Sequence, residues 1–130
     1  MPVLEKLQEE GVDMIEIGIP FSDPVADGPV IQKANLKAIS NGMTVVKLFE
    51  QIAGMRDKII IPVVIMSSLN PILQYGMERF IERCATVGID GLILPDLPID
   101  VYESEYKSLF EKYGINNILL ITPTTSDERI

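Results

Sequence analysis

Residues 76–94 read GMERFIERCATVGIDGLIL and contain one complete helix–strand unit. The first part carries apolar side chains at spacings of three and four, which is typical of one face of an amphipathic helix. These side chains are Met77, Phe80, Ile81 and Cys84. Gly88 follows them, at a position where a glycine commonly ends a helix. The continuous apolar run over 92–94 then predicts a short buried strand.

The same order of elements repeats along the chain. Helices are expected over 2–10, 29–41, 45–52, 76–87 and 102–113, with the opening of another at 125–128. Strands are expected over 14–17, 60–66, 92–94 and 118–121. Because almost wholly apolar strands alternate with helices, the pattern predicts an α/β fold with a parallel sheet. A doubly wound sheet and a β/α barrel both fit this order.

The length fits a doubly wound domain, whereas the loop after the first strand lacks the sequence that such a domain uses to bind nucleotides. A doubly wound domain is complete at 130 residues, whereas a β/α barrel typically needs about 250. A doubly wound nucleotide binder, however, carries a glycine-rich turn after its first strand. Residues 18–24 occupy that position here and read GIPFSDP, and no dinucleotide or P-loop signature occurs elsewhere. Nucleotide binding is therefore disfavoured, and the length predicts a single domain over 1–130.

Composition excludes several classes of function. Lysine and arginine number 11 against 19 acidic residues, and a net charge of −8 disfavours nucleic acid and anionic membranes as partners. One cysteine and no histidine exclude an internal disulfide, histidine-based triads and a histidine-ligated metal. The longest apolar run, 59–66, is far shorter than the roughly 20 residues that span a bilayer. We expect a cytoplasmic protein whose acid–base chemistry uses carboxylates, tyrosines or lysines.

Glu16 is the first candidate for that chemistry, because it interrupts an apolar strand. Burial disfavours a charged carboxylate, so a buried Glu16 is expected to have a raised pKa and to exchange a proton near neutrality. The alternative is that Glu16 faces solvent on an edge strand or pairs with a lysine.

The loop after this strand supplies two further acids, Asp23 and Asp27. Aspartates beside prolines are commonly turn formers. Three prolines in the loop nevertheless predict a stiff segment, which could hold a second carboxylate in place beside Glu16. If the strands are parallel, Asp96 and the Asn70-Pro71 pair, which follow two other strands, lie at the same end of the sheet.

Residues 13–32 read DMIEIGIPFSDPVADGPVIQ and closely resemble the signature of the tryptophan synthase alpha chain family. The resemblance continues through 34–36, 70–72, 75–76 and 88–98, and it ends at 121–123. It implies a TIM (β/α)8-barrel. It also implies that the chain is a single partial domain, a half barrel with about four parallel strands that correspond to barrel strands 2 to 5.

The activity implied by the resemblance is a lyase reaction of tryptophan biosynthesis that uses no cofactor. Indole-3-glycerol phosphate is cleaved to indole and glyceraldehyde 3-phosphate by a retro-aldol reaction. By the same resemblance, Glu16 protonates the indole ring at C3 and Asp27 interacts with the indole N–H. Ile65 and Ile121 are expected to contact the substrate, and no metal is involved.

The resemblance also implies a partner, the pyridoxal-dependent tryptophan synthase beta chain, in an alpha2beta2 complex. Four residues look like the contact surface for that chain: Phe21, Asp23, Asn70 and Pro71.

Two departures from the family pattern bear on activity. Ser67 and Ser68 stand where the family usually places a tyrosine that lines the indole pocket. The family's phosphate-binding loops, which follow barrel strands 6 to 8, have no counterpart here. Since phosphate binding orients such a substrate, the isolated chain is expected to be inactive.

Two other readings stay open at this point. The chain could belong to another phosphate-sugar β/α-barrel enzyme, or it could be a non-catalytic folding and assembly unit. Half a barrel leaves two strand edges unpaired and its interior face uncovered, so self-association as a dimer of half barrels is expected.

Overall fold

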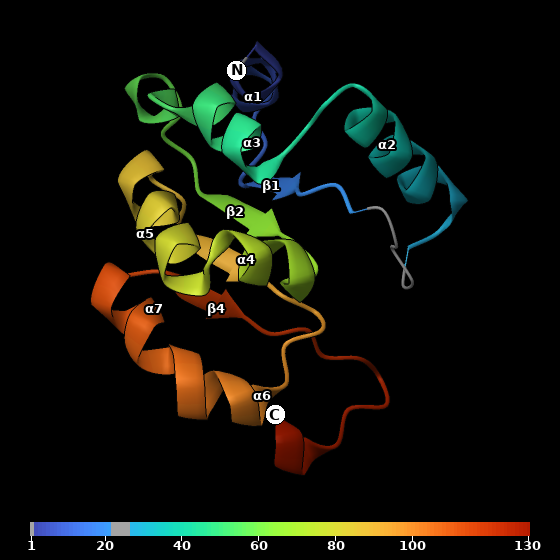
Figure 1. The fold of residues 1–130 in the computed structure, drawn as a ribbon, viewed down its shortest axis with the longest axis vertical. Helices are drawn as coiled ribbons and strands as arrows, with labels where there is room; N and C mark the ends of the chain where they lie inside the picture. Colours follow the sequence, from blue (N-terminus) through green and yellow to red (C-terminus); the bar gives the residue numbers. More distant parts are fainter. Residues whose placement is uncertain (1, 22–26) are drawn as a thin grey trace.

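Four parallel strands form one sheet in the computed structural model, which describes residues 2–21 and 27–130. The strands are β1 (Ile15–Gly18), β2 (Val63–Met66), β3 (Gly91–Ile93) and β4 (Asn116–Ile118). Their order is β1-β2-β3-β4, so each strand pairs with the strand that precedes it in the chain (Figure 1). The predicted α/β class is therefore confirmed. A doubly wound sheet reverses its strand order, and this sheet does not.

Helices connect the strands, and most of them lie against one face of the sheet, whereas the helix over residues 29–40 stands apart from it (Figure 1). They are α1 (Pro2–Glu9), α2 (Pro29–Ser40), α3 (Val45–Ile52), α4 (Leu69–Tyr75), α5 (Met77–Val87), α6 (Ile99–Val101) and α7 (Lys107–Tyr113). Thr44 caps α3, because its hydroxyl accepts a hydrogen bond from the Lys47 N–H at 3.1 Å. None of the helices in the described residues has the length and apolar character needed to cross a membrane.

Three features of the helical layer differ from the sequence-based expectation. Helix α4 was not predicted, because its seven residues follow the apolar run of β2 with only two residues between them. The predicted helix over 102–113 is interrupted by a π-helical turn over Tyr102–Tyr106 that connects α6 to α7. The opening of a helix expected at 125–128 is a short 3-10 turn, Asp127–Arg129.

Strand pairing separates the side chains into two faces. Ile17, Ile65 and Leu92 form one row of paired residues, and Glu16, Val64 and Gly91 form the adjacent row. Successive side chains on a strand point to opposite faces, and paired residues in neighbouring strands share a face. Ile65 and Leu92 belong to the buried core beneath the helices. Glu16, Val64 and Gly91 therefore lie on the opposite face, which we call the open face.

The core under the helices is built around aromatic rings. Phe49 of α3 and Phe80 of α5 lie with ring centroids 5.3 Å apart, and Tyr75 of α4 lies 5.8 Å from Phe49. Phe110 of α7 meets Tyr102 edge-on at 5.2 Å. Phe80 and Phe110 have no exposed surface. The contacts of Phe49 join α3, α4 and α5, and the contact of Phe110 fixes α7 against the residues just before it.

Arg56 fixes the beginning of the two central strands. Its guanidinium donates to the carbonyl of Gly88 at 2.8 and 2.9 Å and to the carbonyl of Ile61 at 2.6 Å. It also forms an ion pair with Asp90, whose carboxylate accepts the N–H of Val63 at 2.8 Å. The segments that enter β2 and β3 are therefore held together by one planar cation. The fixed fork of donors makes arginine suited to such multiple contacts.

The strand limits require two corrections. The predicted strand over 60–66 begins only at Val63, since Pro62 has no N–H to donate and Ile60 is exposed. The predicted strand over 118–121 is instead Asn116–Ile118, which pairs with Gly91–Ile93. Because β3 ends at Ile93, the following residues Leu119, Leu120 and Ile121 leave the sheet and are exposed.

Candidate functional site

Glu16 lies on the open face of β1, and its side chain is exposed. The expectation of a buried carboxyl is therefore wrong for this chain. β1 is an edge strand, and among the described residues no helix covers its open face. The Glu16 side chain makes no hydrogen bond or ion pair to any other described residue. The alternative of a solvent-facing glutamate on an edge strand describes its present position.

Asp27 lies at the other end of the loop, next to the start of α2, and is half-buried. Its backbone carbonyl accepts the side-chain amide of Gln32 at 2.8 Å, and its carboxylate lies 3.5 Å from the side-chain nitrogen of Asn35. Both partners belong to α2, a helix with no fully buried residue. Asp27 is thus oriented by α2 rather than by the sheet. Asp23 lies outside the described residues.

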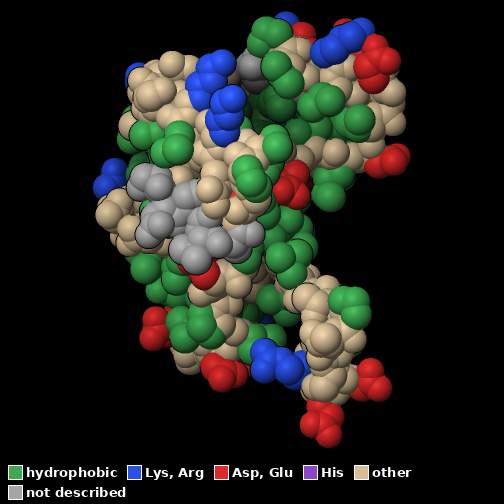
Figure 2. All heavy atoms as spheres, turned by 90° about the vertical axis from the view of Figure 1, so that its right-hand side faces the viewer, with side chains coloured by type: hydrophobic (Ala, Val, Ile, Leu, Met, Phe, Trp, Pro, Cys, Tyr) green, Lys and Arg blue, Asp and Glu red, His purple; other side chains and the backbone are tan. Residues whose placement is uncertain are grey.

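Exposed apolar surface lies beside the open face, although Val64 and Ile93 on the face itself are buried. Figure 2 shows hydrophobic side chains gathered along the side of the molecule that faces right in Figure 1, and this side is hollowed above the projecting C-terminal segment. Exposed apolar residues include Leu119, Leu120 and Ile121 after β4. Monomeric soluble proteins rarely leave broad apolar surfaces uncovered, so this face is suited to contact another protein surface.

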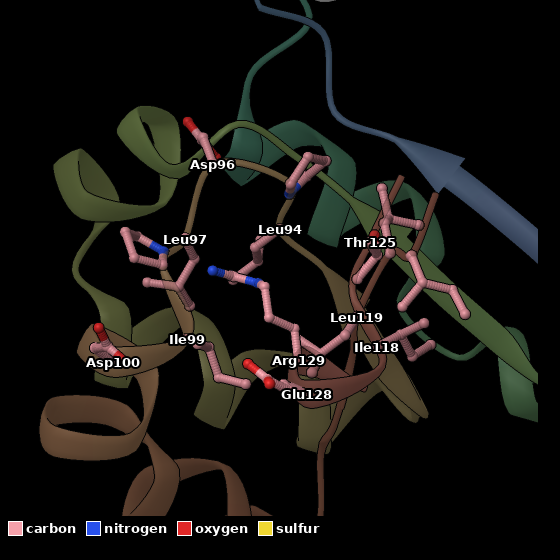
Figure 3. Close-up of a pocket in the computed structure, with 14 residues that line it drawn as sticks. Leu94, Asp96, Leu97, Ile99, Asp100, Ile118, Leu119, Thr125, Glu128 and Arg129 are labelled. Atoms are coloured by element: carbon pink, nitrogen blue, oxygen red, sulfur yellow. The ribbon is translucent and has the colours of Figure 1, made fainter. Parts of the chain in front are cut away.

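A cavity of about 590 Å³ lies where β3 and β4 end. Its walls come from the loop after β3, including Leu94 and Leu97, and from the exposed segment after β4, including Leu119 and Ile121. Figure 3 shows the Arg129 side chain reaching into this cavity toward Leu94. In parallel α/β sheets, ligands bind at the carboxyl ends of the strands, which is where this cavity lies. Ile121, expected to contact substrate, is among its lining residues.

Ile65 does not occupy the position expected of it. Its side chain has no exposed surface and belongs to the core beneath the helices. A side chain enclosed there cannot contact a ligand on the open face, so the expected substrate contact of Ile65 is corrected. Val64 and Met66 of the same strand point to the open face instead. Next to them, Ser67 is buried, and its hydroxyl donates to the Ser68 carbonyl at 2.7 Å.

A second cavity, of about 330 Å³, lies beside the beginning of α4. Phe21, Asn70 and Pro71 line it together with Ile19 and Val45. Three of the four residues expected to contact a partner chain therefore lie together, although Phe21 is about 50 residues away in sequence. They come from the loop after β1 and the first turn of α4. Glu16 and Asp27 line neither of these two cavities.

Asp96 is the polar residue whose role the sequence alone did not specify. It lies in the turn after β3, and both of its carboxylate oxygens accept the backbone N–H of Leu69, at 2.9 and 3.1 Å. Leu69 is the first residue of α4, whose preceding residue Ser68 makes no side-chain cap. A carboxylate from one loop thus caps the helix that follows another strand. Only its position after a strand could have suggested such a role.

The described residues contain no group of three or more acidic or cysteine side chains that could hold a metal ion. Cys84 lies on the buried face of α5 without exposed surface, and burial raises the pKa of its thiol. A thiol in apolar surroundings is structural and unreactive.

We expect Cys84 to make the stability of the fold decrease at alkaline pH. The thiol stays protonated in the folded chain but ionises in the unfolded chain above about pH 8.5. Its contribution is therefore complete below that pH and is lost as the pH rises, by about 1.4 kcal/mol per pH unit. Urea unfolding at pH 7.5 and 9.5 measures this loss. In Cys84→Ala the difference between the two pH values is expected to be smaller by about 1.4 kcal/mol, and an unchanged difference would contradict the assignment.

Comparison with known proteins identifies the family. A family model described as tryptophan synthase alpha chain matches residues 1–130. The tryptophan synthase alpha chain of Christiangramia forsetii is 62% identical over 128 residues, which cover 98% of this chain and 50% of the relative. The crystal structure of tryptophan synthase subunit alpha from Legionella pneumophila superposes with a TM-score of 0.91 at 38% identity, covering 98% of this chain and 49% of that one. Tryptophan synthase from M. tuberculosis in its aminoacrylate-bound form superposes with a TM-score of 0.89 at 33% identity, covering 98% and 51%.

These likenesses confirm the TIM-barrel type of fold, of which four successive strands are present here. The chain spans about half the length of the curated relatives it matches. By sequence and by fold, the chain belongs to the tryptophan synthase alpha chain family.

Proposed function

We propose that this chain supplies the acid–base residues of a lyase that cleaves indole-3-glycerol phosphate to indole and glyceraldehyde 3-phosphate, a reaction of tryptophan biosynthesis. The observation that carries the proposal is the position of Glu16. It is the carboxylate that interrupts an otherwise apolar strand, and it lies on the open face of the parallel sheet in a member of this lyase family.

The reaction needs a proton at the ring carbon C3 and a cleaved bond between C3 and the first carbon of the glycerol chain. Protonation at C3 makes the ring an electron acceptor, so the bonding pair can return to the ring as that bond breaks. The hydroxyl on the released carbon gives its proton to the carboxylate that Glu16 has become, and its oxygen becomes the aldehyde oxygen. We assign the proton donation at C3 to Glu16, because a carboxyl group can deliver a proton at a fixed position.

Asp27 is assigned to the indole N–H, where positive charge develops when C3 is protonated. A carboxylate beside that charge stabilises the transition state more than the ground state. Asn35 and Gln32 support this role by their contacts to Asp27. We assign Ile121 to the apolar part of the substrate pocket, because it borders the cavity at the carboxyl end of the sheet.

The partner we propose is the tryptophan synthase beta chain, bound at the surface formed by Phe21, Asn70 and Pro71. These residues surround the 330 Å³ cavity, which could receive a side chain of the partner. Asp23, which lies in the same loop as Phe21, is assigned to this surface from its place in the sequence. We place the protein in the cytoplasm, where its unpaired thiol at Cys84 is stable.

The test uses a completed chain, in which this sequence is joined to the remaining half of the Christiangramia forsetii relative. The completed chain is expected to release indole from indole-3-glycerol phosphate, whereas the 130-residue chain alone is not. Substrates of neighbouring phosphate-sugar barrels serve as controls for specificity. Cleavage of one of these, with no release of indole, would favour another barrel enzyme and contradict the proposal.

We also propose that the 130-residue chain alone self-associates through its open face. Exposed apolar residues after β4 lie beside this face, and β1 and β4 each leave one edge unpaired in the sheet. A second copy could cover both faces by a twofold arrangement. Sedimentation at micromolar concentration is expected to give twice the mass of one chain, and the completed chain is expected to be monomeric. A compact monomer of the 130-residue chain would contradict self-association.

A further inference from the structure

The loop after β3 and the first turn of α4 are joined by one strong polar contact. Asp96 accepts the Leu69 N–H with both carboxylate oxygens, at 2.9 and 3.1 Å. Figure 3 shows Asp96 at the rim of the 590 Å³ cavity, with its carboxylate directed outward and not toward the cavity's centre. The group therefore serves the neighbouring helix rather than the cavity that its own loop lines.

The first turn of α4 depends on this contact. Ser68, the residue that precedes the helix, makes no side-chain hydrogen bond to the turn, and the Ser67 hydroxyl is already bonded to the Ser68 carbonyl. α4 has only seven residues, so its position is set by tertiary contacts more than by its own helix propensity. Its C-terminal part is held by the core through Ile72 and Tyr75. The start of the helix is held by Asp96.

That first turn carries Asn70 and Pro71, two residues of the surface proposed for the beta chain. Asp96 lies three residues after Ile93, whose register with Met66 places it on the open face. One carboxylate therefore connects the strand end beside the proposed reaction site with the proposed partner surface. We propose that Asp96 is a positioning residue, which holds Asn70 and Pro71 in the arrangement that the beta chain binds; this inference rests on the partner assigned above.

Two variants and a control separate this role from simple stabilisation. Asp96→Ala removes the acceptor, and Asp96→Asn keeps one acceptor oxygen in the same place without the charge. Asp100→Ala is the matched control. Asp100 lies four residues further on, lines the same cavity, and has no hydrogen bond or ion pair to another described residue.

The first measurement is amide hydrogen exchange at Leu69 in the 130-residue chain, which needs no partner. Exchange is expected to be at least about tenfold faster in Asp96→Ala than in the unmodified chain, because a charge-assisted hydrogen bond protects that amide. Exchange at Phe80, in the core, is expected to stay unchanged. Unchanged exchange at Leu69 would overturn the positioning role whether or not a beta chain binds.

The second measurement is the affinity of the completed chain for a purified tryptophan synthase beta chain. Asp96→Ala is expected to weaken binding about tenfold, while Asp96→Asn and Asp100→Ala bind nearly as the unmodified chain does. Equal loss in Asp96→Ala and Asp96→Asn would show that the charge itself contacts the partner, and it would overturn the inference. Affinity unchanged in Asp96→Ala would overturn it as well. If the unmodified completed chain binds no beta chain, the proposed partner is wrong. Exchange at Leu69 still tests whether Asp96 holds the first turn of α4.

Discussion

Replacing Glu16 with glutamine is expected to lower the rate of indole release by the completed chain by about 10²- to 10⁴-fold. Glutamine has nearly the same size and keeps one acceptor oxygen, but it cannot donate a carboxylic proton to C3. The loss should appear in kcat more than in KM, since the interaction with the moving proton develops only in the transition state. Indole release measured over a range of substrate concentrations separates the two parameters.

The matched control for this variant is Asp13→Asn. Asp13 is an exposed carboxylate two residues before β1, so its replacement removes the same charge from the same region. Its rate is expected to stay within about twofold of the unmodified enzyme. The Glu16 side chain makes no hydrogen bond or ion pair with other described residues, so Glu16→Gln should also leave the thermal midpoint of the 130-residue chain unchanged. A Glu16→Gln enzyme with nearly full kcat would remove Glu16 from the proposed chemistry.

Replacing Arg56 with alanine is expected to lower the free energy of unfolding, which is the second large effect. The variant leaves the carbonyls of Gly88 and Ile61 without their donor and the Asp90 carboxylate without its cation. The ion pair itself contributes little, because the Arg56 side chain is 30% exposed and that of Asp90 48%. The larger cost comes from the partly buried carbonyls that lose their donor, about 1–3 kcal/mol. We expect the free energy of unfolding to fall by about 2 kcal/mol and the midpoint by about 7 °C.

Urea unfolding and calorimetry measure this effect, with Arg83→Ala as the control. Arg83 lies on α5 and has no hydrogen bond or ion pair to another described residue, so its loss should cost less than about 0.5 kcal/mol. Arg56→Lys is expected to recover only part of the stability, because an ammonium group lacks the planar fork that reaches three acceptors at once. Equal stability of Arg56→Ala and Arg83→Ala would show that the contacts of Arg56 add nothing.

The sequence was most informative where periodicity and capping agree. The apolar spacing over 76–87 and the glycine at 88 placed α5 to within one residue of its observed limits, and Gly88 adopts the left-handed conformation expected of a helix end. Thr44 likewise marked the start of α3. These features are local, since the residues that produce them are neighbours in the chain.

The errors concern tertiary relations. Ile65 looked suited to a ligand pocket, but the face of a strand residue depends on register, and a shift of one position exchanges the two faces. The end of β4 was placed too late because the sheet ends where the neighbouring strand ends, which no local pattern records. The exposure of Glu16 depends on what covers the open face. Asp96 was noticed for its position, but its acceptor role requires a helix start 27 residues away.

The strictly sequential order of the sheet has a consequence for how this family can be recombined. Within the described residues each strand pairs with the strands next to it in sequence, so β1 and β4 each have one free edge that could pair with a further strand. A break after β4 therefore divides no pair of strands within this set. Half barrels exchanged between relatives at this point should fit together, because only β1 and β4 must each form one new strand pair. A complete barrel could therefore be built from half barrels of different relatives.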